Sequence, residues 1–271
     1  MSIITKIQVQ KLNKERFNIY VDNGKGEEYA FSVDADTIVK FNIKKGQSFE
    51  PYEIEEVLNA DQLRKAYLSS IVYLSRMMRT KKEIEQYLAK QEFLIETIQT
   101  TIIRLVEEGY INEEKYANSY VSTSINTTLK GPTIIKNALV AKGIPNSIIE
   151  KSLTLFSKET QIEHAISLCQ KKVSSLSKYS TNQKKAKLEE LLRRKGYSTN
   201  ISSIAIEETQ YESEADDELE ALLIHARKAK RKYEQLSDWE YKQKMKTTLY
   251  RKGFPIDLIE KAILILEEDE T

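Results

Sequence analysis

A short segment that ends a helix and recurs along the chain is the feature that most constrains the fold. It reads LVAKGI at 139–144, LRRKGY at 192–197 and LYRKGF at 249–254, and a weaker copy reads LAKQEF at 88–93. The first leucines of successive copies are 51, 53 and 57 residues apart. A nearly constant period of this size is typical of repeat proteins, in which each copy is one supersecondary unit.

Apolar residues follow each copy at constant offsets. They occupy ten of the twelve positions that lie five, six and ten residues beyond the glycine, or beyond Glu92 in the weaker copy. This spacing predicts a second helix after each stop. A further helix is expected before each pair, near 61–78, 113–128, 158–177 and 215–233. Because one unit of three helices buries little by itself, neighbouring units should stack. We therefore predict a mainly α fold of tandem three-helix repeats that form a curved array.

The first 50 residues follow a different pattern. Apolar and polar residues alternate around Ile7, Ile19 and Phe31, which indicates half-buried strands. Asn23-Gly24 suits the turn between the second and third runs. We predict a three-stranded antiparallel sheet in a small β-rich element, followed by a short helix over 36–44. The predicted boundaries are 1–55 for this element and 56–110, 111–157, 158–212 and 213–271 for four three-helix repeats.

Helix start and stop signals support these boundaries. Thr80 and Glu83 fit a capping box, and Ser237 with Glu240 repeats the pattern. Pro132 suits a first helical position. Gly143 and Gly253 each follow a helical run, and a proline comes two residues after each glycine, as expected beyond a left-handed cap.

Charge is unevenly distributed along a chain that is nearly neutral overall. The chain has 42 Lys+Arg and 41 Asp+Glu, which argues against a bulk polycation that coats nucleic acid. Residues 124–200 nevertheless hold 14 bases and 5 acids, and residues 227–252 hold 10 and 3. Residues 204–220 hold 8 acids and no bases. Such blocks either steer the protein along a charged partner or are simply solvated helix faces.

Three basic clusters are candidate contacts for a partner or for DNA. Ordinary solvation or capping is the alternative for each of them. The candidate residues are Arg76, Arg79, Lys81, Lys82, Lys130, Lys136, Lys184, Lys185, Lys187, Arg193, Arg194 and Lys195.

An enzyme finds little support in the sequence, and we predict none. His164 and His225 lie in separate repeats, and with Cys169 they give no metal-ligand spacing. Gly24-Lys25-Gly26 lacks the spacing of a phosphate-binding loop. We therefore expect no catalytic residue, no cofactor and no metal. The single cysteine, the absence of a signal-like apolar core and the lack of a membrane-length apolar stretch predict a cytoplasmic protein without membrane contact.

Taken in order, several segments resemble the regulatory protein RecX family. The closest are YLSRMMRTKKEIEQYLAK at 73–90, YINEEKYANSYV at 110–121 and KGPTIIKNALVAKGI at 130–144. In the N-terminal zone, the segments RFNIYVD and VKFNIKKGQ resemble the long form found in low-GC Gram-positive bacteria. The resemblance covers essentially the whole chain. It departs from the family pattern after the Gly131-Pro132 pair, where Thr133 and Ile134 stand in place of an arginine.

The resemblance implies a negative modulator of the RecA recombinase. Family members bind along the groove of the RecA filament on single-stranded DNA and reduce ATP hydrolysis, strand exchange and co-protease activity. The implied processes are DNA repair, recombination and the SOS response. The implied partners are the RecA filament and single-stranded DNA, with double-stranded DNA left open, and the chain is expected to be a monomer. The alternatives are a general nucleic-acid-binding helical module, and a scaffold array for another protein.

Overall fold

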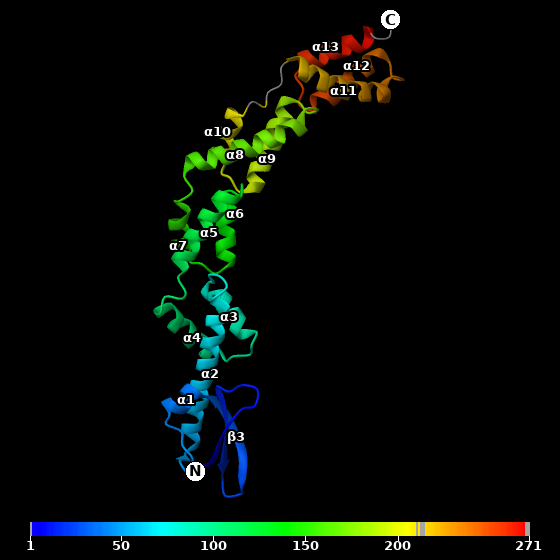
Figure 1. Cartoon of the computed structure of the whole chain (residues 1–271). Coiled ribbons are helices and arrows are strands. Elements are labelled where there is room, and N and C mark those ends of the chain that lie inside the picture. Colours follow the sequence, from blue (N-terminus) through cyan, green and yellow to red (C-terminus); the bar gives the residue numbers. More distant parts are fainter. Residues whose placement is uncertain (1, 210, 212–214, 269–271) are drawn as a thin grey trace. The chain divides into compact units, whose positions relative to one another are not determined.

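The chain forms a small sheet followed by helices in groups of three (Figure 1). The computed structural model describes residues 2–209, 211 and 215–268. The predicted fold class is confirmed: the described residues contain thirteen α-helices and four strands. Two compact units are present, residues 1–116 with 142–144 and residues 117–141 with 145–271, and each is described by itself.

The strands and helices have the following bounds. The sheet contains β1 (Ser2–Val9), β2 (Arg16–Asp22), β3 (Glu27–Asp34) and β4 (Ser48–Phe49). The first unit also contains α1 (Ala35–Lys40), α2 (Pro51–Leu74), α3 (Lys81–Ala89) and α4 (Ile95–Glu107). Later come α5 (Glu113–Thr127), α6 (Pro132–Ala141), α7 (Asn146–Leu153), α8 (Lys158–Val173), η1 (Ser174–Leu176), α9 (Thr181–Lys195), α10 (Thr199–Glu208), α11 (Ala215–Tyr233), α12 (Asp238–Tyr250) and α13 (Ile256–Glu268).

The N-terminal sheet is antiparallel, with the strand order β3-β2-β1-β4. The three predicted strands are confirmed, and the two-residue strand β4 adds a fourth that is too short to show a sequence period. Ile19 and Val33 are fully buried in the core beneath the sheet. The alternation fails at strand ends, where Val9 is 46% and Tyr29 56% exposed.

The short helix α1 ends earlier than predicted. It stops at Lys40 rather than Lys44, because Phe41 caps it and Asn42 adopts a positive φ of 49°. Asparagine tolerates this left-handed conformation better than most residues. The sequence gives no other stop signal at this point.

Helix α2 belongs to both the sheet element and the first repeat. It begins at Pro51, ten residues before the predicted start, because Val57 packs into the core beneath the sheet. Farther along the same helix, Ala66 packs into the core of the first repeat. The other three leading helices, α5, α8 and α11, lie where the sequence predicts them.

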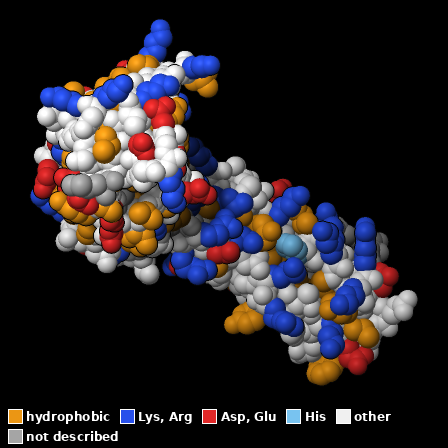
Figure 2. Space-filling model, turned by 90° about the horizontal axis from the view of Figure 1, so that it is seen from below, with side chains coloured by type: hydrophobic (Ala, Val, Ile, Leu, Met, Phe, Trp, Pro, Cys, Tyr) orange, Lys and Arg blue, Asp and Glu red, His pale blue; other side chains and the backbone are white. Residues whose placement is uncertain are grey.

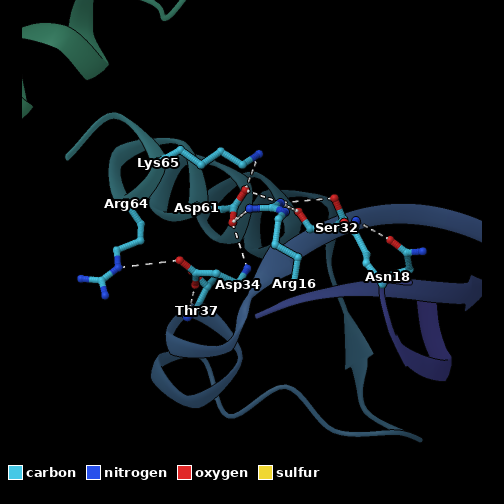
Figure 3. A network of polar contacts seen from close by, with 9 residues as sticks. Arg16, Asn18, Ser32, Asp34, Thr37, Asp61, Arg64 and Lys65 are labelled. Atoms are coloured by element: carbon cyan, nitrogen blue, oxygen red, sulfur yellow. Dashed lines mark hydrogen bonds and ion pairs between the residues drawn. The ribbon is translucent and has the colours of Figure 1, made fainter. Parts of the chain in front are cut away.

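A buried carboxylate ties α2 to the sheet (Figure 3). Asp61 is 1% exposed and accepts two hydrogen bonds from the Arg16 guanidinium, at 3.1 and 3.2 Å. It also accepts the backbone amide of Asp34, at 3.0 Å, and pairs with the Lys65 ammonium at 2.8 Å. Arg16 comes from β2 and Asp34 from the end of β3, so one side chain holds three elements together.

The predicted helix caps are mostly confirmed. Thr80 accepts the Glu83 amide, and the Glu83 carboxylate accepts the Thr80 amide, which completes the capping box. Pro132 is the first residue of α6. The expected second capping box at Ser237 is wrong: the Ser237 hydroxyl donates to the Glu240 carboxylate and makes no cap hydrogen bond to the helix backbone.

The middle helices of the repeats, α3, α6, α9 and α12, share one contact, which we call the repeat joint. The residue just before a middle helix bonds the lysine carbonyl of the Lys-Gly pair that ends the next middle helix. In the first unit, the Thr80 hydroxyl donates to the Lys142 carbonyl at 2.8 Å. In the second unit, the Gly131 amide donates to the Lys195 carbonyl at 2.7 Å, and the Ser180 hydroxyl to the Lys252 carbonyl at 2.7 Å.

The joint satisfies backbone groups that a helix leaves without partners. Helix starts have orphan amides and helix ends have orphan carbonyls. At the joint formed by Gly131 and Gly196, the amides of Gly131 and Thr133 reach the carbonyls of Lys195 and Gly196. The helix dipoles add to this attraction, since a positive helix end meets a negative one.

The glycines of the joints are required by space as well as by conformation. Gly143, Gly196 and Gly253 have φ values of 82°, 88° and 77°, in the left-handed region. A Cβ on Gly196 would lie 2.9 Å from the Ile134 backbone nitrogen, and a Cβ on Gly131 would lie 2.5 Å from the Gly196 carbonyl carbon and oxygen. Two backbones therefore approach too closely for any side chain.

Glu92 occupies the corresponding position in the first repeat. It keeps the left-handed conformation, with φ 63°. No three-helix repeat precedes it, so no earlier middle helix needs the space that a glycine would leave. The joint thus explains why this copy alone departs from the Lys-Gly pattern.

Replacing Glu92 with glycine is expected to stabilise the first unit. The gain should be roughly 0.5 to 1 kcal/mol, which is the left-handed penalty of a side chain less the greater unfolded-state entropy of glycine. Urea denaturation of Glu92→Gly and Glu92→Ala would measure it. The alanine variant keeps the penalty, so an equal gain in both variants would contradict the explanation.

Candidate partner-binding surface

Helix α9 carries the densest group of candidate contact residues. The Ser180 hydroxyl caps its start by accepting the Gln183 amide, and Gly196 ends it in the left-handed conformation. Leu188 and Leu192 are fully buried on its inner face. Three basic residues fill the last turn, where the negative end of the helix dipole favours cations.

A basic groove lies beside α9, where α8 and η1 approach it. It has a volume of about 260 Å³ and is lined by Lys172, Ser175, Leu176, Tyr179, Lys187, Glu190, Leu191 and Arg194. We call this the basic groove. The Lys187 ammonium lies 4.5 Å from the centroid of the Tyr179 ring. A cation over an aromatic face is attracted by the electron-rich face of the ring.

The chemistry of the basic groove suits an anion. Lys172, Lys187 and Arg194 provide three positive charges against the single carboxylate of Glu190. The Tyr179 ring and Leu191 add apolar surface between the charges. A phosphate chain that carries bases, or an acidic protein segment, has the mixed character that this lining matches.

The structure brings together only part of the predicted set on α9. Lys187 and Arg194 line the basic groove, whereas Lys185 and Arg193 are exposed on other faces. Lys195 is half-buried, and its carbonyl lies in a repeat joint. Lys184 corrects the prediction: it is 4% exposed, beneath the helix, and cannot reach a partner without rearrangement.

The other predicted cations are more dispersed. Arg76 and Lys130 are exposed, and their side chains make no hydrogen bond or ion pair with any part of the chain that the structure describes. Lys136 pairs with Glu150 at 2.5 Å, and Lys81 pairs with Glu113 at 3.6 Å.

Two residues of the first cluster are held against neighbouring groups. The Arg79 guanidinium lies 4.1 Å from the Tyr73 ring centroid. Lys82 is exposed, and a Cβ on Gly143 would lie 2.9 Å from the Lys82 Cβ.

Sequence reasoning missed Lys172 and Tyr179 as members of a site. Lys172 lies in the last turn of α8, inside the basic block that composition identified. The signal that could have found the site is the spacing of Lys187, Leu191 and Arg194, which places these residues on one face of α9. Which residues face them depends on the packing of α8 on α9.

No group on the described chain stands out as a nucleophile or a metal site. Burial raises the pKa of the Cys169 thiol to about 11, although the Thr209 hydroxyl opposes this, so the thiol stays protonated at neutral pH. No cluster of His, Cys, Asp and Glu among the described residues has the arrangement of a metal site. Over the same residues, no helix combines the length and apolar character needed to cross a bilayer.

One face of the surface shows how the charges are spread (Figure 2). Lys and Arg side chains form separate groups with hydrophobic side chains between them. At the lower right of the view they clearly outnumber Asp and Glu side chains. A surface of this kind offers several local contacts rather than one continuous basic field.

The fold defines a helical-repeat protein, and the basic groove is its candidate binding surface. Four family models match: the regulatory protein RecX N-terminal domain at residues 2–50, and the RecX first, second and third three-helix domains. The first two helical models match 66–105 and 112–153, and the third matches twice, at 159–206 and 216–263. The chain belongs to the RecX family.

Similar proteins and solved structures agree with this assignment. The chain is 45% identical to Regulatory protein RecX of Bacillus cereus strain B4264, over 100% of both chains. It is 45% identical to the protein of the same name from Bacillus cytotoxicus, over 96% of both. A crystal structure of regulatory protein RecX matches 77% of this chain and 100% of its own, with a TM-score of 0.66 and 35% identity. RecX from Lactobacillus salivarius matches 55% of this chain and 97% of its own, with a TM-score of 0.53 and 36% identity.

Proposed function

We propose that this protein is a negative modulator of the RecA recombinase. It binds along the groove of the RecA–DNA filament and inhibits ATP hydrolysis, strand exchange and co-protease activity. The observation that carries the proposal is full-length similarity to proteins named Regulatory protein RecX, including both the N-terminal domain and the helical repeats.

The repeat architecture supports a long, periodic partner. Each repeat presents its own surface, and the joints recur with the same chemistry. Several weak contacts made by successive repeats add up, because each bound repeat raises the local concentration of the next at its site. A filament of identical protomers offers such sites at regular intervals.

Inhibition follows from bridging. A chain that contacts neighbouring protomers restricts the rearrangements that accompany ATP hydrolysis. It also occupies the groove into which a duplex or a repressor docks. The basic groove beside α9 supplies the contact to phosphate or to an acidic segment of the filament.

Titration of the protein into RecA filaments on single-stranded DNA tests the proposal. Phosphate release should fall as the filaments become saturated, and strand exchange should fall with it. Binding can be followed in parallel by anisotropy of a labelled chain. Unchanged ATP turnover at saturating binding would contradict the inhibitory part of the proposal.

Neutralising the basic groove should weaken binding to anionic partners. We expect Lys172→Gln, Lys187→Gln and Arg194→Gln together to reduce the salt slope of single-stranded DNA binding by about one for each lost phosphate contact. Fluorescence anisotropy between about 50 and 200 mM salt measures the slope. Lys261→Gln, on an exposed residue of α13, is the control and should leave the slope nearly unchanged.

A second candidate function is general nucleic-acid binding without a dedicated protein partner. The observation in its favour is the basic groove, whose three cations suit phosphate. Under this alternative, affinity for DNA should fall steeply with salt and should not change when RecA is present. Tighter binding to filaments than to bare DNA at the same salt concentration favours the RecA proposal.

A further inference from the structure

Repeat 2 is formed by α5–α7 and repeat 4 by α11–α13. In each of them, an ion pair connects the last two helices. A lysine seven residues before the joint glycine pairs with a glutamate seven residues after it. The Lys136 ammonium lies 2.5 Å from the Glu150 carboxylate, and the Lys246 ammonium lies 2.6 Å from the Glu260 carboxylate. The same Lys–Glu ion pair therefore bridges equivalent positions in the two repeats.

Repeat 3, formed by α8–α10, lacks both partners of this pair. Counting seven residues from Gly196 gives Glu189 where the lysine stands and Ser203 where the glutamate stands. Instead of an ion pair there is an open groove of about 410 Å³ between α9 and α10, which we call the acidic groove. Its charged lining residues are Glu189, Glu190 and Arg193, so carboxylates are in the majority.

The charged groups of the acidic groove have no partners within the described part of the chain. The side chains of Glu189, Glu190 and Arg193 make no ion pair or hydrogen bond within the described part of the chain. Ser202 is only 6% exposed and lines the groove, yet no hydrogen bond of its hydroxyl is found among the described residues. A hydroxyl that has no partner within the chain and borders a groove marks a place where a polar ligand group fits.

We propose that the acidic groove receives a Lys or Arg side chain of the protein partner. The partner's cation takes the place that the lysine ammonium holds in repeats 2 and 4. Its aliphatic stem lies against Ala186 and the Tyr197 ring, both of which line the groove. Its N–H groups donate to the Glu189 carboxylate and to the Ser202 hydroxyl.

The two grooves beside α9 select different chemistry. Glu190 lines both, but the basic groove holds three cations and the acidic groove holds one. Carboxylates without partners repel a phosphate chain, so nucleic acid is disfavoured in the acidic groove. The inference rests on the proposed function, since the partner that supplies the basic side chain is then a RecA protomer.

Charge reversal at Glu189 tests the inference. In Glu189→Lys the new ammonium opposes the incoming cation, and affinity for RecA filaments on single-stranded DNA should fall about 10-fold. The double variant Glu189→Lys, Ser203→Glu rebuilds the internal pair of repeats 2 and 4 and should show a loss at least as large. Because repeats 2 and 4 already accommodate this pair, the double variant should keep its fold, which circular dichroism can check.

Glu207→Lys is the matched control. It makes the same charge change at an exposed position of α10 that does not line the groove, and filament affinity should stay within about twofold. Affinity for free single-stranded DNA should not fall in any of the three variants, because each is more positively charged than the native chain.

The outcomes separate the inference from the proposed function. If the native protein does not bind filaments, the proposed function is wrong. If the native protein binds and Glu189→Lys binds equally well, or more tightly, the acidic groove is not a site for a basic side chain. A parallel loss with Glu207→Lys, or a loss of free-DNA binding, would also overturn the inference.

Discussion

Gly196→Ala is expected to lower the free energy of unfolding of the second unit by about 3 kcal/mol. A side chain at φ 88° costs about 1 to 2 kcal/mol. Its Cβ would also lie 2.9 Å from the Ile134 backbone nitrogen, and such overpacking adds about 1 to 3 kcal/mol. Urea denaturation followed by circular dichroism, with hydrogen exchange to locate the change in α6 and α9, measures the effect.

Gly109→Ala is the control that separates conformation from contact. Gly109 has φ 78°, but a Cβ there would meet no atom within 4 Å. This variant should show only the conformational part, about 1 to 2 kcal/mol. Equal losses in both variants would mean that the close approach at the Gly131–Gly196 joint contributes nothing to stability.

Asp61→Asn is expected to destabilise the attachment of the N-terminal sheet to α2 by about 3 kcal/mol. Removing one partner of a buried ion pair leaves the other charge uncompensated. The Arg16 side chain is 15% exposed and would lose the carboxylate that it contacts through two nitrogens. The amides of β1, β2 and β3 should then exchange faster with solvent than those of α3 and α4.

The exposed pair of the same region provides the comparison. Asp36 pairs with Arg64, and its side chain is 66% exposed. Asp36→Asn should cost less than about 1 kcal/mol, because water screens an exposed pair. If the strand amides exchange at the same rate in the two variants, burial of Asp61 does not account for the attachment of the sheet.

The joint glycines have two roles, and only one of them can be recognised from the local sequence. Gly196 and Gly253 are recognisable in the sequence as helix stops, because a left-handed cap depends on one residue and its neighbours. Their second role, as the surfaces against which the preceding middle helix starts, could not be read in the same way. The Thr80 hydroxyl and the Lys142 carbonyl are 62 residues apart, and the Ser180 hydroxyl and the Lys252 carbonyl are 72 apart.

For the candidate contact residues too, the sequence indicates some features and only the structure shows the others. Composition identified the basic block at 124–200, and helical spacing could also have placed Lys187 and Arg194 on one face of the helix. Charge alone could not show that Lys184 lies buried while Lys172 faces the groove from α8. Nor could it show that repeat 3 replaces an internal ion pair with an open groove, since this depends on comparing equivalent positions in three dimensions.

The sequence by itself determined the helical class, the four tandem repeats, the N-terminal strands and most helix caps. These features depend on periodicity and on single residues with special backbone preferences, so the local sequence is enough to encode them. Only the tertiary structure decided which helix ends meet, which carboxylate is buried beneath the sheet, and which cations share a groove. These features depend on contacts between residues far apart in the chain, and such contacts are fixed by packing rather than by local preference.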